Sequence, residues 1–106
     1  MQQNNKLLSM LGLARRAGRL SMGHDMAAKS IASGKARVLL FAKDISARAQ
    51  KDMLVIVEKQ RVSVPVIYLS STIDEIHFAL GYKAGIITVD DENFAEKIKS
   101  LANTLD

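Results

Sequence analysis

Short apolar runs alternate with helical patterns along this chain, and this alternation constrains the fold more than any other feature. The runs at residues 38–42, 64–69 and 86–89 contain no charged side chain, and apolar residues at helical spacing flank each of them. Uninterrupted apolar runs are typical of strands that are covered on both faces. Together with a short strand near residues 19–21, the pattern predicts an α/β protein: a three-layer α/β/α sandwich with a four-stranded mixed central sheet.

Capping residues and glycines mark the ends of the predicted helices. The second helix begins near Gly23, and the third runs to about residue 60. The predicted caps and stops are Ser46, Thr72 with Glu75 in a capping box, and Asp90 at helix starts, and Gly18, Gly34 and Gly81 at helix ends.

Length and composition exclude several classes of protein. The 106 residues are enough for a sizeable core, and we expect 1–106 to be a single domain. No run reaches membrane-spanning length, and the first residues lack the features of a signal peptide, so we expect a cytoplasmic protein that does not contact membranes. With no cysteine and two histidines far apart in sequence, we expect no disulfide, metal or other cofactor.

One short pattern imitates a nucleotide-binding loop. Lys29 and Ser30 follow Gly23 at the right spacing, but Ala28 replaces the second glycine of the phosphate-binding pattern. That glycine turns the loop so that its amides cradle phosphate, and here the residues from Asp25 onward favour a helix. Since no nucleophile, base and orienting group can be assembled elsewhere, the sequence predicts a protein that is not an enzyme.

Positive charge is concentrated in the first half of the chain. Residues 1–53 carry ten Lys or Arg and three Asp, a net charge of +7. Residues 54–106 carry five basic and eight acidic side chains, a net charge of −3. This asymmetry indicates a side that faces a polyanion, although an unevenly charged solvated surface explains it equally well.

The basic residues on and after the second helix favour the polyanion. We expect four of them to form one patch that neutralises phosphates, beside a helix start whose free N–H groups attract anions. They are Lys29, Lys35, Arg37 and Lys43. His24, at the helix start, either touches a phosphate or is an ordinary surface residue.

Few aromatic side chains are expected at the surface. Phe41, Phe78 and Phe94 fall at positions predicted to be buried, which leaves Tyr68 and Tyr82. A stacking platform for single strands is therefore not expected, and a folded RNA of defined shape suits the composition better.

Five segments occur in a specific order along nearly the whole chain. They are residues 11–18 (LGLARRAG), 23–29 (GHDMAAK), 33–44 (SGKARVLLFAKD), 64–66 (VPV) and 91–95 (DENFA). In this order they resemble the bacterial YlxQ-type ribosomal-protein-like family, a branch of the kink-turn-binding ribosomal protein superfamily of the L-seven-Ae type.

The resemblance implies a non-enzymatic α/β/α sandwich that binds kinked RNA duplexes with tandem sheared G·A pairs. In that superfamily the turn into the second helix follows Gly-x-Asn-Glu-x-x-Lys, whose polar residues read the sheared pairs. Gly23 and Lys29 match this pattern, whereas Asp25 stands at the Asn position and Met26 at the Glu position. Asp25 lacks the amide donor, and Met26 cannot accept a hydrogen bond from a guanine edge. This predicts either weak kink-turn binding or recognition of a different RNA feature.

The resemblance also implies a second binding segment. In the superfamily a loop before the last strand covers an extruded nucleotide, and the corresponding residues are Tyr82, Lys83, Ala84, Gly85 and Ile86. We therefore predict a monomeric RNA-binding ribosomal or translation-associated protein. Its expected partner is structured RNA, such as ribosomal RNA or an mRNA leader, with the ribosome as a candidate assembly. The alternative is a protein–protein interaction module on the same scaffold.

Overall fold

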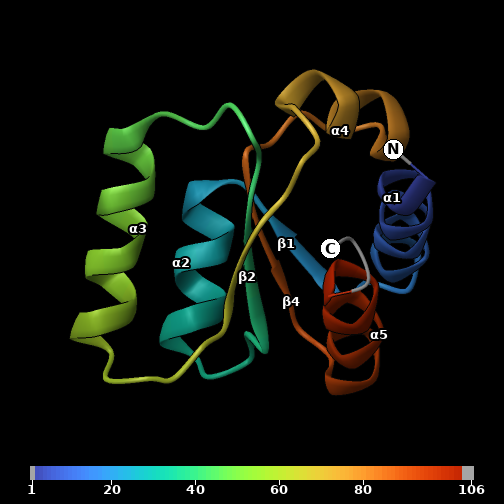
Figure 1. Cartoon of the computed structure of the whole chain (residues 1–106). Coiled ribbons are helices and arrows are strands. Elements are labelled where there is room, and N and C mark those ends of the chain that lie inside the picture. The colour runs from blue at the N-terminus through green and yellow to red at the C-terminus, as the bar shows by residue number, and fades with distance from the viewer. Residues whose placement is uncertain (1, 104–106) are drawn as a thin grey trace.

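A four-stranded sheet in the order β1-β4-β2-β3 forms the middle layer of the computed structural model, which describes residues 2–103 (Figure 1). Strand β4 pairs antiparallel with both β1 and β2, and β2 pairs parallel with β3. The strands are β1 (Leu20–Met22), β2 (Val38–Phe41), β3 (Val66–Tyr68) and β4 (Ile86–Val89). The prediction of a mixed four-stranded sheet is confirmed.

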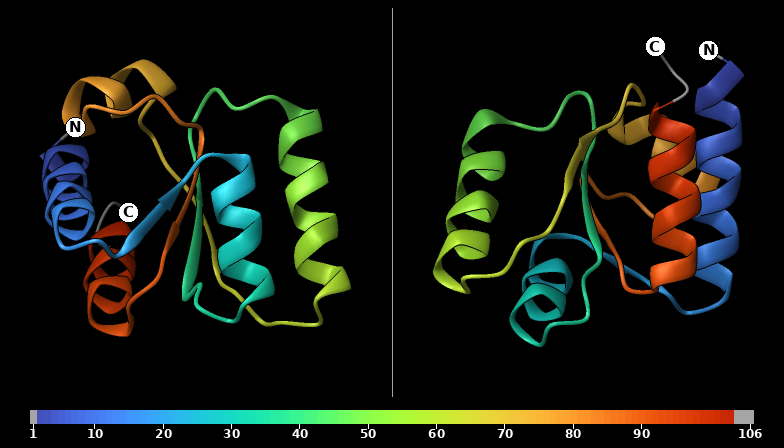
Figure 2. Two further views of the ribbon diagram at one scale, coloured as in Figure 1. Left: turned by 180° about the vertical axis from the view of Figure 1, so that it is seen from behind. Right: turned by 60° about the horizontal axis from the view of Figure 1, so that its bottom comes forward.

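Helices cover both faces of the sheet. Helices α2 and α3 pack on one face, and α1, α4 and α5 pack on the other (Figure 2). The helices are α1 (Gln2–Arg16), α2 (His24–Ala32), α3 (Ala47–Lys59), α4 (Ile73–Leu80) and α5 (Glu92–Asn103). The three-layer α/β/α sandwich is therefore confirmed. None of the helices in residues 2–103 combines the length and the apolarity needed to cross a membrane.

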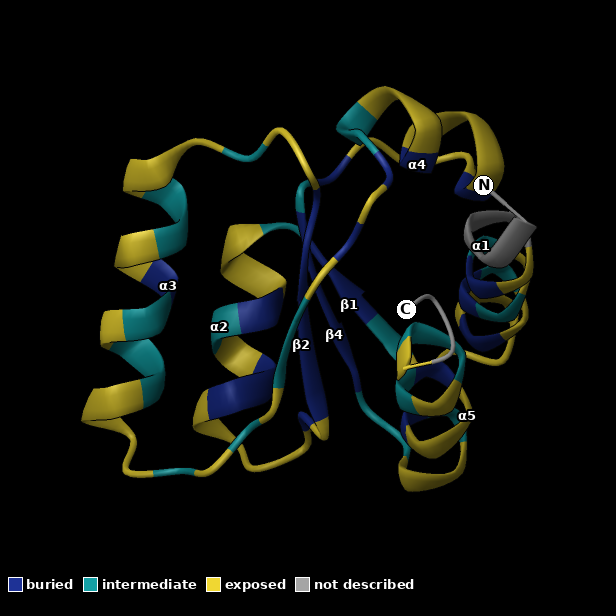
Figure 3. Cartoon of the chain, viewed as in Figure 1, coloured by how far each residue is buried: buried dark blue, intermediate teal, exposed yellow. Residues whose placement is uncertain are grey.

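Strand β2 shows why the apolar runs are uninterrupted. Val38 and Leu40 join the core cluster under α1, α4 and α5, whereas Leu39 and Phe41 join the cluster under α2 and α3. All four side chains are fully buried, as in the dark centre of Figure 3. Strand β4 is also buried throughout, with one polar residue, Thr88. A central strand between two helical layers thus needs apolar residues on both faces.

Side-chain caps fix where two of the helices begin. The Ser46 hydroxyl accepts a hydrogen bond from the Ala49 N–H at 3.1 Å at the start of α3. At the start of α4, the Thr72 hydroxyl accepts from the Glu75 N–H at 3.1 Å, and the Glu75 carboxylate accepts from the Thr72 N–H at 2.8 Å. Both sequence predictions are confirmed.

The last helix is capped by Asp91 rather than by Asp90, so this prediction is wrong. Asp91 Oδ2 accepts a hydrogen bond from the Phe94 N–H at 2.9 Å, and α5 begins at Glu92. Capping preferences alone do not separate two adjacent aspartates. The difference arises because the carboxylate of Asp90 is bound by hydroxyl groups of other elements.

Phe78 is exposed, contrary to the sequence prediction. Helix α4 turns Ile76 and Leu80 toward the core. Phe78 is two positions beyond Ile76, about 200° around the helix, and its side chain points away from the core. It is 94% exposed, whereas Phe41 is fully buried.

Candidate nucleic-acid interface

The turn between β1 and α2 depends on Gly23, whose backbone has φ 95° and ψ 164°. Residues with a Cβ rarely adopt such a positive φ, which explains why glycine stands here. The Gly23 N–H donates to the carbonyl oxygen of Ile86 at 2.8 Å, and the Gly23 carbonyl accepts from the Ala27 N–H at 3.0 Å. Helix α2 therefore begins directly beside the first residue of β4.

The first turn of α2 is exposed and carries His24, Asp25 and Met26. Because the helical bond to Gly23 comes from Ala27, the N–H groups of these three residues precede the hydrogen-bonded helix. Asp25 Oδ1 lies 3.4 Å from His24 Nδ1. The turn thus presents backbone donors, a carboxylate, an imidazole and the Met26 side chain, which is 52% exposed.

Lys29 lies one turn further along α2 and is exposed. It shares the outer side of the helix with Asp25, four residues earlier. Within residues 2–103 the carboxylate of Asp25 contacts His24, and the structure shows no ion pair between Asp25 and Lys29. The ammonium group of Lys29 therefore faces solvent and is available to an anion.

The segment 82–86 lies at the same end of the strands as Gly23. The carbonyl of Gly85 accepts a hydrogen bond from the Ala42 N–H at 2.9 Å, just after β2. A Cβ on Gly85 would lie 3.1 Å from Ile73 Cδ1, so the segment packs closely against the start of α4. Tyr82 and Lys83 are exposed, Gly85 is half-buried, and Ala84 and Ile86 are buried. The segment therefore offers two side chains to a partner.

Lys43 also lies at this end of the strands. Its N–H donates to the Ser71 carbonyl at 2.8 Å, which holds the backbone after β2, and its side chain is exposed. Residues 23–26, Lys43 and 82–86 thus meet at one end of the strands, where β1 and β2 end and β4 begins. This end lies at the top in Figure 1. We call this surface, together with the exposed Lys29 one turn along α2, the Gly23 edge.

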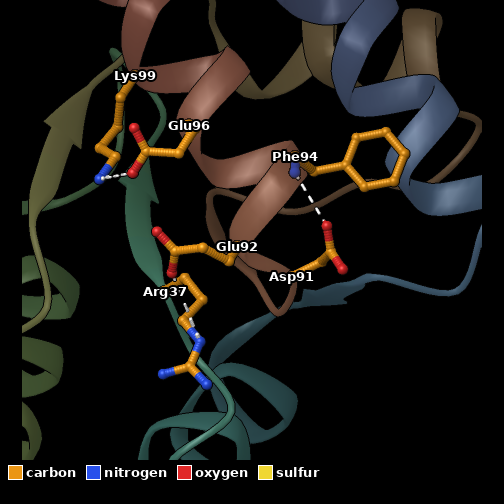
Figure 4. A network of polar contacts seen from close by, with 6 residues as sticks. All are labelled: Arg37, Asp91, Glu92, Phe94, Glu96 and Lys99. Atoms are coloured by element: carbon orange, nitrogen blue, oxygen red, sulfur yellow. Dashed lines mark hydrogen bonds and ion pairs between the residues drawn. The ribbon is translucent and has the colours of Figure 1, made fainter.

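Lys35 and Arg37 lie at the opposite end of the strands, where β2 begins and β4 ends. The Arg37 N–H donates to the carbonyl of Val89, the last residue of β4, at 2.8 Å. Arg37 Nε faces Glu92 Oε1 at 3.9 Å (Figure 4). Because α2 runs from one end of the strands to the other, the four predicted cations do not form one patch.

Acidic residues of α5 accompany Arg37, since Glu92 faces it and Glu96 follows one turn further along the helix. Beyond Glu92, Lys99 Nζ lies 2.8 Å from Glu96 Oε2 on the surface of α5 (Figure 4). The hydrogen bond from Lys99, with a smaller contribution from Glu92, lowers the pKa of Glu96 below its ordinary value of 4.5. The same hydrogen bond raises the pKa of Lys99 above 10.5. This end of the strands therefore suits an anion less well than the Gly23 edge.

Sequence reasoning missed a group of hydroxyls around Asp90, which we call the Asp90 cluster. Ser21 Oγ donates to Asp90 Oδ2 at 2.6 Å, and Ser30 Oγ and Thr88 Oγ1 donate to Oδ1 at 2.6 and 2.9 Å. The three donors come from β1, α2 and β4, so the carboxylate ties α2 to the sheet. The available signal was three hydroxyl residues at positions where the strand and helix patterns favour apolar side chains.

Arg15 is a second residue that sequence reasoning did not assign to the site. Its guanidinium carbon lies 6.0 Å from the centre of the Tyr82 ring, within the range of a cation–π contact. The last turn of α1 therefore extends the Gly23 edge beyond the segment 82–86.

The Gly23 edge has the chemistry of a binding surface for a shaped anion. It combines backbone donors at a helix start with exposed cations and an aromatic ring. In the part of the chain that the structure describes, no group of three or more His, Asp or Glu residues could hold a metal ion.

Comparison with known proteins gives matches over most of the chain. Residues 5–94 match the ribosomal protein L7Ae/L30e/S12e/Gadd45 family. The RNA-binding protein YlxQ of Enterococcus faecium is 31% identical over 99 residues, covering 91% of this chain and 90% of that protein.

Two solved structures share the architecture. A Bacillus halodurans protein of unknown function has a TM-score of 0.81 at 26% identity, covering 92% of this chain and 97% of that chain. The 15.5 kD RNA-binding protein of Giardia lamblia has a TM-score of 0.71 at 13% identity, covering 98% of this chain and 88% of that chain. At this identity the Giardia likeness is one of fold.

Proposed function

The chain belongs to the ribosomal protein L7Ae/L30e/S12e/Gadd45 family, and from this membership we propose that it binds structured RNA of the kinked-duplex type through the Gly23 edge. Two similar proteins, from Enterococcus faecium and Giardia lamblia, are named as RNA-binding. We further propose that the chain acts as a cytoplasmic monomer on an RNA of the translation machinery, because the family is named for ribosomal proteins.

The observation that carries the proposal is the hydrogen bond from the Gly23 N–H to the Ile86 carbonyl at 2.8 Å. It places the first turn of α2 next to the segment 82–86, although the two are far apart in sequence. A kinked duplex offers two features at once, a distorted groove and a displaced nucleotide. The two neighbouring segments of the Gly23 edge can engage these features together, the helix start facing the groove and Tyr82 with Lys83 facing the nucleotide.

Shape and phosphate contacts provide most of the proposed recognition. Asp25 can accept hydrogen bonds from base amino groups but can donate none, and Met26 offers only apolar contact and a weakly accepting sulfur. The N–H groups of the first turn, Lys29 and Lys43 favour phosphate oxygens. We therefore propose a protein that selects the form of an RNA more strictly than the sequence of its paired bases.

Binding to a kink-turn RNA and to a straight duplex of the same length, measured by fluorescence anisotropy across a salt series, tests this proposal. We expect tighter binding to the kink-turn and an affinity that falls as salt rises, since phosphate contacts release counterions. Equal affinities for the two RNAs would contradict kink-turn recognition. Absence of any salt-dependent binding would contradict RNA binding itself.

A matched pair of lysine variants locates the surface. Lys29→Ala should weaken binding by about 1 to 3 kcal/mol and reduce the salt slope by about one unit, because one phosphate contact is lost. Lys97→Ala removes the same charge from α5, away from the Gly23 edge, and should leave the affinity unchanged. Equal effects of the two substitutions would show that net charge, rather than the Gly23 edge, determines binding.

A further inference from the structure

Helix α4 exposes an aromatic ring that packing within the chain does not explain. The inner side of the helix is complete, since Ile76 and Leu80 are buried in the core. Phe78 lies on the outer side and is 94% exposed. A single exposed apolar side chain is common at protein surfaces, so the ring points to a partner only together with the other groups that follow it in the chain.

A second exposed ring follows shortly after Phe78. Tyr82 lies just beyond the left-handed cap Gly81 and is 47% exposed. The Arg15 guanidinium lies 6.0 Å from the centre of the Tyr82 ring, so this ring is bordered by a cation from α1. Aromatic rings next to arginine are the usual means of stacking unpaired bases, because the ring contacts the base while the cation attracts the neighbouring phosphate.

Helix α4 also lies beside the proposed RNA surface. The close contact between Gly85 and Ile73 joins the start of α4 to the segment 82–86. Figure 1 shows α4 at the same end of the sheet as the turn into α2. A strand that leaves an RNA bound at the Gly23 edge can therefore continue onto the outer side of α4.

The charges around Phe78 indicate how such a strand would run. Asp74 and Glu75, one turn earlier in α4, repel phosphates, although the Glu75 carboxylate is engaged by the Thr72 N–H at 2.8 Å. Arg15 contacts the Tyr82 ring, and Lys83, the next residue after Tyr82, is exposed. The backbone of the strand would thus follow the two cations, and an uncharged base would reach Phe78.

Building on the proposed function, we propose that Phe78, Tyr82 and Arg15 form a platform that stacks unpaired nucleobases flanking the bound RNA. The platform shares Tyr82 with the proposed cover over a displaced nucleotide and adds Phe78, which lies on the outer side of α4 and outside the segment 82–86. With this platform the protein recognises a junction between structured and single-stranded RNA.

The test compares a blunt kink-turn RNA with the same RNA carrying three unpaired adenosines at one end or the other, by fluorescence anisotropy. We expect a tail at one end to tighten binding by about 5- to 150-fold, the range given by stacking of one base on an aromatic ring. Phe78→Ala should remove this gain and leave the affinity for blunt RNA unchanged. Because Phe78 is exposed, the variant should fold normally, which its melting temperature verifies.

Tyr68→Leu is the matched control. Tyr68 is 59% exposed on the edge strand β3, and leucine keeps an apolar contact with Phe41, whose ring centre lies 5.6 Å from that of Tyr68. The control should keep the full gain from the tail. Equal affinities for tailed and blunt RNA, or a gain that survives Phe78→Ala, would overturn the platform while binding of blunt RNA upholds the proposed function. If a protein rather than RNA covers this surface, tailed and blunt RNA bind equally well, which also overturns the platform. Loss of binding to every RNA would overturn both proposals.

Discussion

Replacing Asp90 with alanine removes the acceptor of three hydroxyl groups at once. Ser21, Ser30 and Thr88 are exposed by 9%, 4% and 0%, so solvent replaces the lost acceptor poorly. A buried donor left without an acceptor costs about 1 to 3 kcal/mol. Since Asp90 itself is half-buried and its removal admits some water, we use about 1 kcal/mol for each donor. Asp90→Ala should therefore lower the free energy of unfolding by about 3 kcal/mol, which corresponds to roughly 12 to 24 °C in Tm.

Urea denaturation followed by circular dichroism measures this loss, and Asp90→Asn provides a graded comparison. The asparagine keeps one oxygen for Ser30 and Thr88, which both donate to Oδ1, but its amide cannot accept from Ser21. We expect it to lose about 1 to 1.5 kcal/mol. A loss below about 1 kcal/mol for Asp90→Ala, or equal losses for the two variants, would refute the view that the Asp90 cluster holds α2 on the sheet.

Two further predictions concern the turn into α2 and the surface of α5. Gly23→Ala should lower the free energy of unfolding by about 1 to 3 kcal/mol, because the backbone has φ 95° and ψ 164°, a conformation that is essentially restricted to glycine. No atom lies within 4 Å of the added Cβ, so unchanged urea denaturation would contradict backbone strain as the cause. Lys99→Met should return the pKa of Glu96 toward 4.5 in a carboxyl NMR titration. Because the folded-state pKa of Glu96 is lowered, the pair stabilises the fold above pH 4.5, and this contribution is lost as the pH falls through the folded-state pKa. Identical titrations of Glu96 in the two proteins would contradict this.

Most of the architecture could be predicted from patterns among residues that are close in sequence. The run at residues 38–42 predicted a strand that is buried on both faces, and β2 is such a strand. Ser46 and Thr72 cap the helices that they were predicted to cap. These features depend on residues close in sequence or on burial alone, and both leave a clear pattern in the chain.

The candidate site was harder to predict because it depends on which ends of the elements meet. Lys35 and Lys43 are close in sequence, but β2 lies between them, so they are at opposite ends of that strand. Phe78 was assigned to the core because its apolar character suggested burial, whereas Ile76 and Leu80 already fill the inner side of α4. Asp90 satisfied the rule for a helix cap, and only the three-dimensional approach of hydroxyls from three elements shows its role.

The position of β4 in the sheet has a consequence for how the chain folds. This strand lies between β1 and β2, yet it is the last strand to be synthesised. In the described sheet β1 pairs only with β4, and the Gly23 N–H finds its acceptor, Ile86, only when β4 is in place. Pairing between segments so distant in sequence slows folding, because a long loop must close before any contact compensates for it. A growing chain therefore cannot complete the Gly23 edge until residue 86 has left the ribosome.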